Sequence, residues 1–254
     1  MIRPPQALGF YPPSKSALED MIEKLLEKAE VKKEVKWGIA PHAGYVYSGL
    51  AAATLFKNLK KSKEIVILGV DHYGIARDIA LHPYEAWQTP LGEVEVSKKL
   101  EKKIMEIGPQ IVDSPREHSI EVQLPFLQFI WGDFKFLPVT VPSVPISRLK
   151  ELGEVLKKLK APIIASSDFS HYVPKEVAIK LDSIAIEKII EKDAEGLIKM
   201  VYDLNITMCG YNGVAALLYS LPKKARGELF TYYTSGDITG DYTSVVGYAA
   251  IGFR

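Results

Sequence analysis

The sequence contains only one cysteine, Cys209, among 254 residues. A single cysteine forms no disulfide within the chain, so nothing here requires an oxidising compartment. No apolar stretch is long enough to span a bilayer, and the N-terminus lacks the apolar core of a signal peptide. Basic and acidic residues nearly balance, 32 against 31, which argues against nucleic acid or a membrane surface as a partner. We therefore expect a cytoplasmic protein.

Two common enzyme motifs are also missing. Without Gly-x-Ser-x-Gly, the sequence offers no nucleophile elbow of an α/β-hydrolase. Without Gly-x-Gly-x-x-Gly or a Walker loop, it offers no dinucleotide or nucleoside triphosphate site. There is no internal repeat and no Gly/Ser linker, and the proline-rich segment 138–145 is too short and apolar to separate domains. The sequence predicts one domain over residues 1–254.

What the sequence does contain is an alternation of strand and helix patterns. Apolar runs predict strands at 37–40, 64–70, 134–141 and 162–166, with weaker candidates at 78–82 and 93–96. Helical spacing predicts helices at 18–29, 48–59, 97–108, 119–131, 147–160, 174–192, 193–203 and 210–220. Ser16 and Ser48 are the expected caps of the first two helices.

This alternation defines the expected fold class. Strands separated by helices favour a mostly parallel sheet between helical layers. The last two strand-like runs, 228–234 and 244–253, have no helix between them and indicate an antiparallel addition. The prediction is an α/β protein, a three-layer α/β/α sandwich with a central, mostly parallel, mixed sheet.

The histidines follow the predicted strands. His42, His72 and His171 each come just after a strand, and His118 lies in a polar turn. Loops at the carboxyl ends of parallel strands converge on one edge of a sheet, where ligands bind. The histidines therefore predict one shared site of metal ligands or acid–base groups. Each taken singly is also consistent with a histidine that only satisfies backbone groups, and His82 receives no role.

Three further residues are candidates for the same site. Asp168 stands three residues before His171 and could orient that imidazole or coordinate beside it, or only form an Asx-turn. Cys209 precedes a predicted helix start, where the dipole favours the thiolate, although lone cysteines often fill a core. Glu117 could pair with His118, which would then act as an outer partner or proton shuttle, or remain a solvated loop residue.

Taken together, these segments resemble the Memo family, whose eukaryotic members are described as mediators of ErbB-driven cell motility. The resemblance extends in order over nearly the whole chain. The matching segments are Pro41–Gly49, Asp71–His72, Thr89–Glu93, Glu117–Pro125, Ser166–His171, Met208–Gly210, Tyr233–Asp237 and Ser244–Tyr248.

The resemblance implies both a fold and a site. The Memo family is similar in fold to class III extradiol dioxygenases, which are non-haem iron enzymes. The resemblance implies that His42, His72 and Cys209 are metal ligands, with Asp168 and His171 beside them as catalytic groups. A thiolate in place of a carboxylate suits copper as well as iron, and zinc is an alternative.

We therefore expect a metal-binding, oxidoreductase-like Memo protein, with His118 or His171 moving protons. One alternative is a metal-independent binding module for phosphotyrosine-like or other anionic ligands, with Arg116 and a helix beginning at Ser119 as anion-binding elements. Another is a metal-dependent hydrolase in which Asp168 activates water. The partner would be a small molecule or peptide, and the resemblance implies a functional link to radical-SAM and Ammecr-type proteins.

Overall fold

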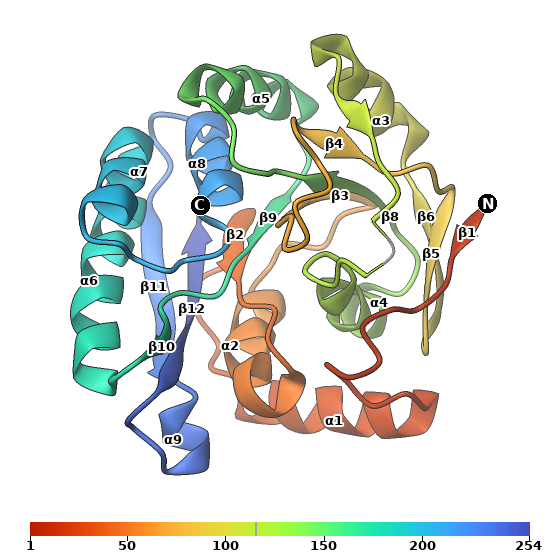
Figure 1. Cartoon of the computed structure of the whole chain (residues 1–254). Helices are drawn as coiled ribbons and strands as arrows, with labels where there is room; N and C mark the ends of the chain where they lie inside the picture. Colours follow the sequence, from red (N-terminus) through yellow and green to blue (C-terminus); the bar gives the residue numbers. More distant parts are fainter. Residues whose placement is uncertain (115) are drawn as a thin grey trace.

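The computed structural model describes residues 1–114 and 116–254. Helices and strands alternate along the chain (Figure 1). The strands are β1 (Ile2–Arg3), β2 (Trp37–Ala40), β3 (Glu64–Gly69), β4 (Ala80–Leu81), β5 (Ala86–Thr89), β6 (Gly92–Val96), β7 (Gln110–Ile111), β8 (Lys135–Thr140), β9 (Ile163–Ser166), β10 (His171–Val173), β11 (Gly227–Thr234) and β12 (Val245–Phe253). The helices are α1 (Lys15–Lys28), α2 (Tyr45–Lys57), α3 (Lys98–Ile104), α4 (Leu124–Trp131), α5 (Ile146–Leu159), α6 (Lys175–Glu191), α7 (Ala194–Asp203), α8 (Tyr211–Ser220) and α9 (Gly236–Thr239), with 3₁₀ turns η1 (Met105–Ile107) and η2 (Glu121–Gln123).

The strands of the described residues belong to one mixed sheet. Its main path runs β1, β5, β6, β8, β3, β9, β2, β12, β10, while β11 pairs with β12, and β4 pairs with β7 and β8. The five strands from β6 to β2 are parallel neighbours. Strand β12 is antiparallel to β2, β10 and β11. The predicted mostly parallel sheet with an antiparallel addition is confirmed.

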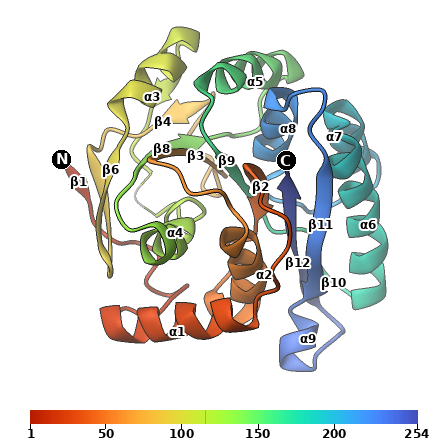
Figure 2. The ribbon, with the colours of Figure 1, turned by 180° about the vertical axis from the view of Figure 1, so that it is seen from behind.

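Helices cover both faces of this sheet, as the two opposite views show (Figures 1 and 2). On one side α2 packs against α1 and α4. On the other side α3, α5, α8, α7 and α6 pack side by side in that order. The molecule is therefore an α/β protein with three layers, as the alternation of patterns predicts.

Burial explains why the central strands are continuous apolar runs. Strand β3 has helices above and below it, and its residues from Ile65 to Gly69 are buried. A strand covered on both faces has no solvated side on which to place alternating polar residues. Helix α5 instead faces the sheet with one side only, and it buries Leu149, Leu152 and Leu156 at helical spacing.

Several predicted boundaries are wrong. Helix α1 is capped by Ser14, whose hydroxyl accepts from the Ala17 N–H, and not by Ser16. Gly44 stands at the N-cap of α2, while Ser48 lies inside that helix and donates to the Ala43 carbonyl. These are local errors of a few residues, because a serine near a helix start satisfies the capping pattern in more than one register.

Other differences concern whole elements. The predicted helix at 119–131 becomes a helix only from Leu124, after the turn η2. The predicted strand at 78–82 shortens to β4. Strands β1, β5, β7 and β10 were not predicted, because runs of two to four residues carry no periodic signal.

The sheet order has a direct consequence for the site. Strands β3, β9 and β2 are adjacent and parallel, so their carboxyl ends lie side by side. The segments that carry His72, Asp168 and His42 leave the sheet at these three ends. Parallel pairing therefore brings together residues that are far apart in the sequence.

Candidate metal centre

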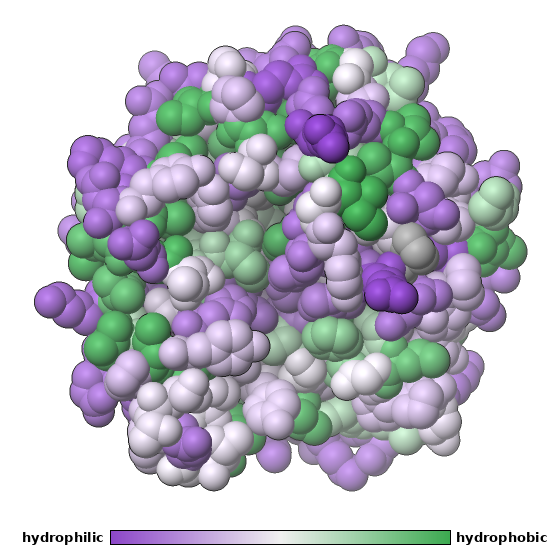
Figure 3. Space-filling model, in the orientation of Figure 1, coloured by the Kyte–Doolittle hydropathy of each residue, from purple (hydrophilic) through white to green (hydrophobic). Residues whose placement is uncertain are grey.

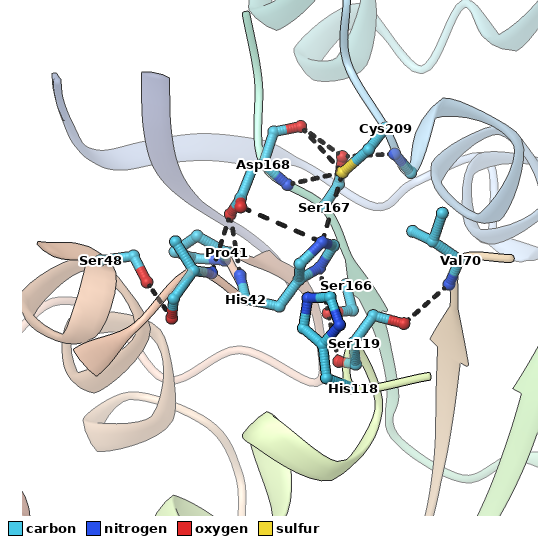
Figure 4. A network of polar contacts seen from close by, with 12 residues as sticks. Pro41, His42, Ser48, Val70, His118, Ser119, Ser166, Ser167, Asp168 and Cys209 are labelled. Carbon is cyan, nitrogen blue, oxygen red and sulfur yellow. Dashed lines mark hydrogen bonds and ion pairs between the residues drawn. The ribbon is translucent and has the colours of Figure 1, made fainter. Parts of the chain in front are cut away.

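Three imidazole rings meet at this edge of the sheet. The ring centroids of His42 and His72 are 5.2 Å apart, those of His42 and His118 5.5 Å, and those of His72 and His118 4.8 Å. One ligand nitrogen from each ring lies within 4.8 Å of the others, an arrangement that can hold a metal ion. In Figure 4 the His42 ring lies between Cys209 and His118. The surface in front of these loops is hollowed near the middle of the face (Figure 3).

The protonation of His42 follows from its hydrogen bonds. Its Nδ1 lies 2.9 Å from the Ser166 hydroxyl, which donates its only proton to the Ser119 carbonyl. That hydroxyl also accepts from the amide of Gln123, so Nδ1 of His42 must be the donor to it. Burial, followed by the charge of His72, lowers the pKa of His42 to about 3. His42 is therefore neutral, and the lone pair of its Nε2 faces Sγ of Cys209.

Glu117 fixes His72 in the same way. Its carboxylate is fully buried and lies 3.1 Å from Nδ1 of His72, and it also accepts from the backbone N–H groups of His72 and Ser119. Burial acts to lower the pKa of His72, but the hydrogen bond and charge of Glu117 outweigh it and raise that pKa. Burial acts to raise the pKa of Glu117, yet the bonds from His72 and Ser119 bring it down to about 2. A carboxylate on Nδ1 leaves Nε2 to bind a metal.

His118 is held by stacking. Its ring stacks on Phe10 at 4.0 Å and on His72 at 4.8 Å, with interplanar angles of 18° and 9°. Within the described part of the chain, neither ring nitrogen of His118 forms a hydrogen bond, and its Nδ1 is 4.0 Å from Glu117. Burial, then the charge of His42, lowers the pKa of His118 to about 3. Glu117 therefore lies within ion-pair distance of His118, as predicted, but its closer partner is His72, at 3.1 Å.

Cys209 lies on the other side of His42. Its Sγ is 3.4 Å from Nε2 of His42 and accepts from the backbone N–H of Asp168 at 3.3 Å. Gly210 makes this approach feasible, because a Cβ there would lie 2.4 Å from the Ser166 carbonyl oxygen. Burial and the charge of Asp168 raise the pKa of the thiol well above its ordinary value. The expected thiolate is therefore wrong for the protein without metal.

Asp168 is tied to the His42 loop. Its Oδ1 accepts from the backbone N–H groups of His42 at 2.8 Å and Ala43 at 3.4 Å, and its Oδ2 lies 4.0 Å from Nε2 of His42. Burial raises the pKa of this carboxyl. The carboxyl therefore holds the loop with one oxygen and presents the other toward the ring, which a local Asx-turn would not do.

His171 lies at the border of the pocket. Its backbone N–H donates to the Thr207 hydroxyl at 2.7 Å, and its Nδ1 donates to the Thr207 carbonyl at 2.8 Å. This leaves Nε2 of His171 unprotonated in the neutral ring. The preceding residue, Ser170, is held by the buried carboxylate of Asp182 through both its N–H and its hydroxyl.

The structure thus brings five of the predicted site residues into one group, with Glu117 bound to His72 and His171 at the border. We call His42, His72, His118, Cys209 and Asp168 the histidine pocket. His82 lies elsewhere and is buried, with Nε2 3.0 Å from the Thr140 hydroxyl.

Some partners were missed by the sequence reasoning. Two of them contact histidines that are distant in sequence: Phe10 stacks on His118, and Thr207 binds His171. The third, Asp182, binds Ser170, which precedes His171. No local motif marks them, so only the fold reveals them.

Fold and pocket define an α/β protein with a preformed, three-imidazole candidate metal centre. The family model of the Memo-like protein matches residues 3–252. A MEMO1 family protein of Methanococcoides burtonii is 41% identical, with 99% of each chain covered. Another from Nitrosopumilus maritimus is 36% identical over the full length of both chains. The chain belongs to the Memo-like family.

One solved structure supports the fold. An uncharacterised protein of Escherichia coli K12 superposes with a TM-score of 0.59 at 12% identity, covering 86% of this chain and 99% of the other. At this identity the likeness concerns the fold alone. Among the described residues, every helix is too short or too polar to cross a membrane.

Proposed function

We propose that this Memo-family protein binds a transition metal in the histidine pocket and uses it in oxidoreductase chemistry. The observation that carries the proposal is the state of His42 and His72. Each ring uses Nδ1 in a hydrogen bond, to Ser166 and Glu117 respectively, and so leaves Nε2 for a metal. Both rings are fixed before any metal arrives, which lowers the entropic cost of binding.

Cys209 fits as the third ligand. In a tetrahedral site with bonds of roughly 2.0–2.3 Å, two ligand atoms lie about 3.5 Å apart. The distance of 3.4 Å between Sγ of Cys209 and Nε2 of His42 matches this separation. His118 offers a competing third ligand through the three-histidine group. We favour Cys209 because, among the described residues, no hydrogen bond fixes one nitrogen of His118 for ligation.

The donor set limits the metal. Two imidazoles and a thiolate suit copper and iron, and zinc also accepts them. When bound, copper or iron supplies one-electron chemistry, which is the basis for proposing an oxidoreductase. The expected likeness to class III extradiol dioxygenases belongs to the same proposal.

The remaining groups handle protons. Asp168 has a raised pKa and an oxygen near His42, so it can take up or release a proton, or complete the ligand set. His118 can carry a proton on either nitrogen and suits a shuttle. His171 presents its free Nε2 as an acceptor at the border of the pocket.

Metal analysis of untagged protein tests the proposal. We expect near-stoichiometric copper or iron in the wild-type protein. Cys209→Ser should contain much less metal, with little change in the melting temperature, and folded His82→Asn should contain as much metal as the wild type. Protein that takes up no metal with all three ligands intact would sink the proposal. If His118→Asn loses the metal and Cys209→Ser retains it, the third ligand is the imidazole of His118 and not the thiolate.

Two alternatives have weaker support. Hydrolysis would need Asp168 to activate a water on zinc, and its burial and position allow this. A metal-independent module for anionic ligands would use Arg116, but the helix start expected at Ser119 is not there, because η2 begins at Glu121. Peptide titration before and after chelation distinguishes the binding module from the metal-dependent functions, because the module would bind peptide equally well without metal.

Cytoplasmic location, a small-molecule or peptide ligand and the link to radical-SAM and Ammecr-type proteins stay predictions.

A further inference from the structure

A second pocket lies beside the histidine pocket and has a different chemistry. It has a volume of about 330 Å³, which is within the range of small-ligand pockets. Its lining includes three tyrosines, one carboxylate and several hydroxyl groups: Tyr47, Tyr172, Tyr248, Asp241, Ser235 and Thr239. We call these residues the tyrosine pocket.

The tyrosine pocket adjoins the candidate metal centre. Tyr47 is in the first turn of α2, which follows the His42 loop. Tyr172 follows His171 in the sequence, and the rings of these two residues are 5.7 Å apart. Tyr248 comes from β12, and the charge of Asp168, after burial, raises its pKa. A ligand in the tyrosine pocket would therefore lie next to the groups that we propose to handle protons.

The aromatic walls are held in place. Tyr248 is only 2% exposed and forms the floor, whereas Tyr172 is 77% exposed and stands at the rim. The hydroxyl of Tyr233 donates to the Tyr47 carbonyl at 2.9 Å, and the Tyr233 ring lies 5.7 Å from that of Tyr248. These contacts hold the backbone at Tyr47 and pack the ring of Tyr248 before a ligand binds.

The rim residue adopts an unusual backbone conformation. Tyr172 has φ of +58°, a region that bulky side chains rarely adopt. It lies at a shift of register between β10 and β12, where His171 and Val173 pair but Tyr172 does not. A bulge of this kind redirects a side chain out of the sheet. Here it presents the Tyr172 ring at the pocket.

The charge of the pocket selects its ligand. Within the described residues that line it there is no lysine, arginine or histidine, and Asp241 is the one ionisable acid. Lys175, close by but outside the lining, is already paired with Asp237 and lies 4.5 Å from the Tyr242 ring. An anion would meet a carboxylate and no cation. A cation would meet the carboxylate and the negative faces of aromatic rings.

We propose that the tyrosine pocket binds an organic ammonium group, between the rings of Tyr47, Tyr172 and Tyr248 and near the carboxylate of Asp241. The site needs no metal, so it stands or falls separately from the proposed metal centre. If both are correct, the metal centre acts on molecules that carry an ammonium group.

Calorimetric titration of the full chain, with a chelator present, tests this proposal. The probes are choline and its uncharged isostere, in which a tert-butyl group replaces the trimethylammonium group. We expect choline to bind about tenfold more tightly than the isostere, as cation–π attraction and a carboxylate together require. Equal affinities, or tighter binding of inorganic phosphate, would overturn the proposal, as would no choline binding at millimolar concentration.

Variants locate the site. Tyr172→Leu should weaken choline binding about fivefold, while Tyr172→Phe retains it, because the ring and not the hydroxyl provides the attraction. Asp241→Asn should weaken it independently, and because Asp241 is exposed we expect little effect on folding. Tyr202→Leu, an exposed tyrosine on α7, is the control and should change nothing. Binding that survives both Tyr172→Leu and Asp241→Asn contradicts the assignment.

Discussion

The two edges of the parallel sheet are built very differently. At the carboxyl edge, the histidine pocket holds the buried ring of His42 and the half-buried ring of His118, and burial lowers the pKa of both to about 3. At the opposite edge, where β3 and β8 begin, lies a cavity of about 720 Å³. Its lining includes Lys63, Glu64, Glu95, Lys99 and Lys135, which we call the lysine–glutamate cavity.

The difference is one of preorganisation. In the lysine–glutamate cavity, Lys99 pairs with Glu64 and Lys135 with Glu95, through lysine side chains that are 81% and 55% exposed. Such pairs are mobile, hydrated and already neutralised. In the histidine pocket, hydrogen bonds on Nδ1 fix the orientation of the His42 and His72 rings. The carboxyl edge is therefore the one equipped for chemistry.

The largest expected effect is on metal binding at the carboxyl edge. His42→Ala removes a ligand. Loss of an outer hydrogen-bond partner lowers metal affinity by up to roughly a hundredfold. We expect the loss of a ligand to lower the affinity for copper by more than that. Lys99→Gln, in the lysine–glutamate cavity, should leave that affinity unchanged. Competition titration against a chromophoric chelator measures both. Similar losses in the two variants would erase the contrast between the edges.

The next effect concerns Glu117, which orients His72. Glu117→Gln should lower metal affinity about tenfold to hundredfold and lower the free energy of unfolding by about 1–3 kcal/mol. The exposed Glu93→Gln is the matched control, with a change of no more than about 0.5 kcal/mol.

The stability loss in Glu117→Gln should depend on pH. The lowered pKa of Glu117 contributes stability above its unfolded value of about 4.3, which is lost as pH falls through about 2. The raised pKa of His72 contributes below its unfolded value of about 6.5, and that contribution is lost as pH rises through the folded value. Urea unfolding should show the largest difference between wild type and variant from about pH 4.3 to 6.5. A difference independent of pH would mean that the pair is not ionised.

A smaller effect is the pH dependence of metal affinity. Burial raises the pKa of the Cys209 thiol, and Glu117 raises that of His72, so both groups must lose a proton to ligate. Affinity should therefore rise with pH, by about tenfold per pH unit for each proton released. Cys209→Ser should show a shallower slope between about pH 6 and 8. Equal slopes would indicate that the sulfur is not a ligand.

The smallest effect belongs to the lysine–glutamate cavity itself. Lys135→Gln breaks an exposed ion pair with Glu95 and should change the unfolding free energy by less than about 1 kcal/mol. The change should shrink further in high salt, which screens exposed charges. A larger loss that persists in salt would show that this edge is also preorganised.

Much of the fold could be predicted, because the central strands are buried on both faces. Such strands read as unbroken apolar runs, and β3 and β9 lie within a residue or two of their predicted positions. Strands β1 and β7 could not be predicted, because two-residue strands such as Ile2–Arg3 are held by tertiary contacts and have no sequence pattern of their own.

The site divides along the same line. His42, His72 and Asp168 follow strands that are parallel neighbours, so the strand-end rule places them together without further information. The sequence indicates a pairing of Glu117 with its neighbour His118, but not the closer contact with His72, which lies 45 residues away. That pairing depends on how the loop before η2 folds back onto β3.

Cys209 shows a different limit. The sequence places it before a helix, where a thiolate is favoured. Its pKa depends instead on burial beside Asp168, which only the packed structure determines. A metal ion would reverse this effect by taking the place of the proton.

X-ray absorption of the copper-reconstituted, untagged protein tests the central claim most directly. The account predicts one sulfur at roughly 2.3 Å and two imidazole nitrogens at roughly 2.0 Å from the metal, values typical of thiolate and imidazole ligation. Cys209→Ser should remove the sulfur contribution and keep both nitrogens. A metal shell with no sulfur in the wild-type protein, or no retained metal at all, would contradict the account.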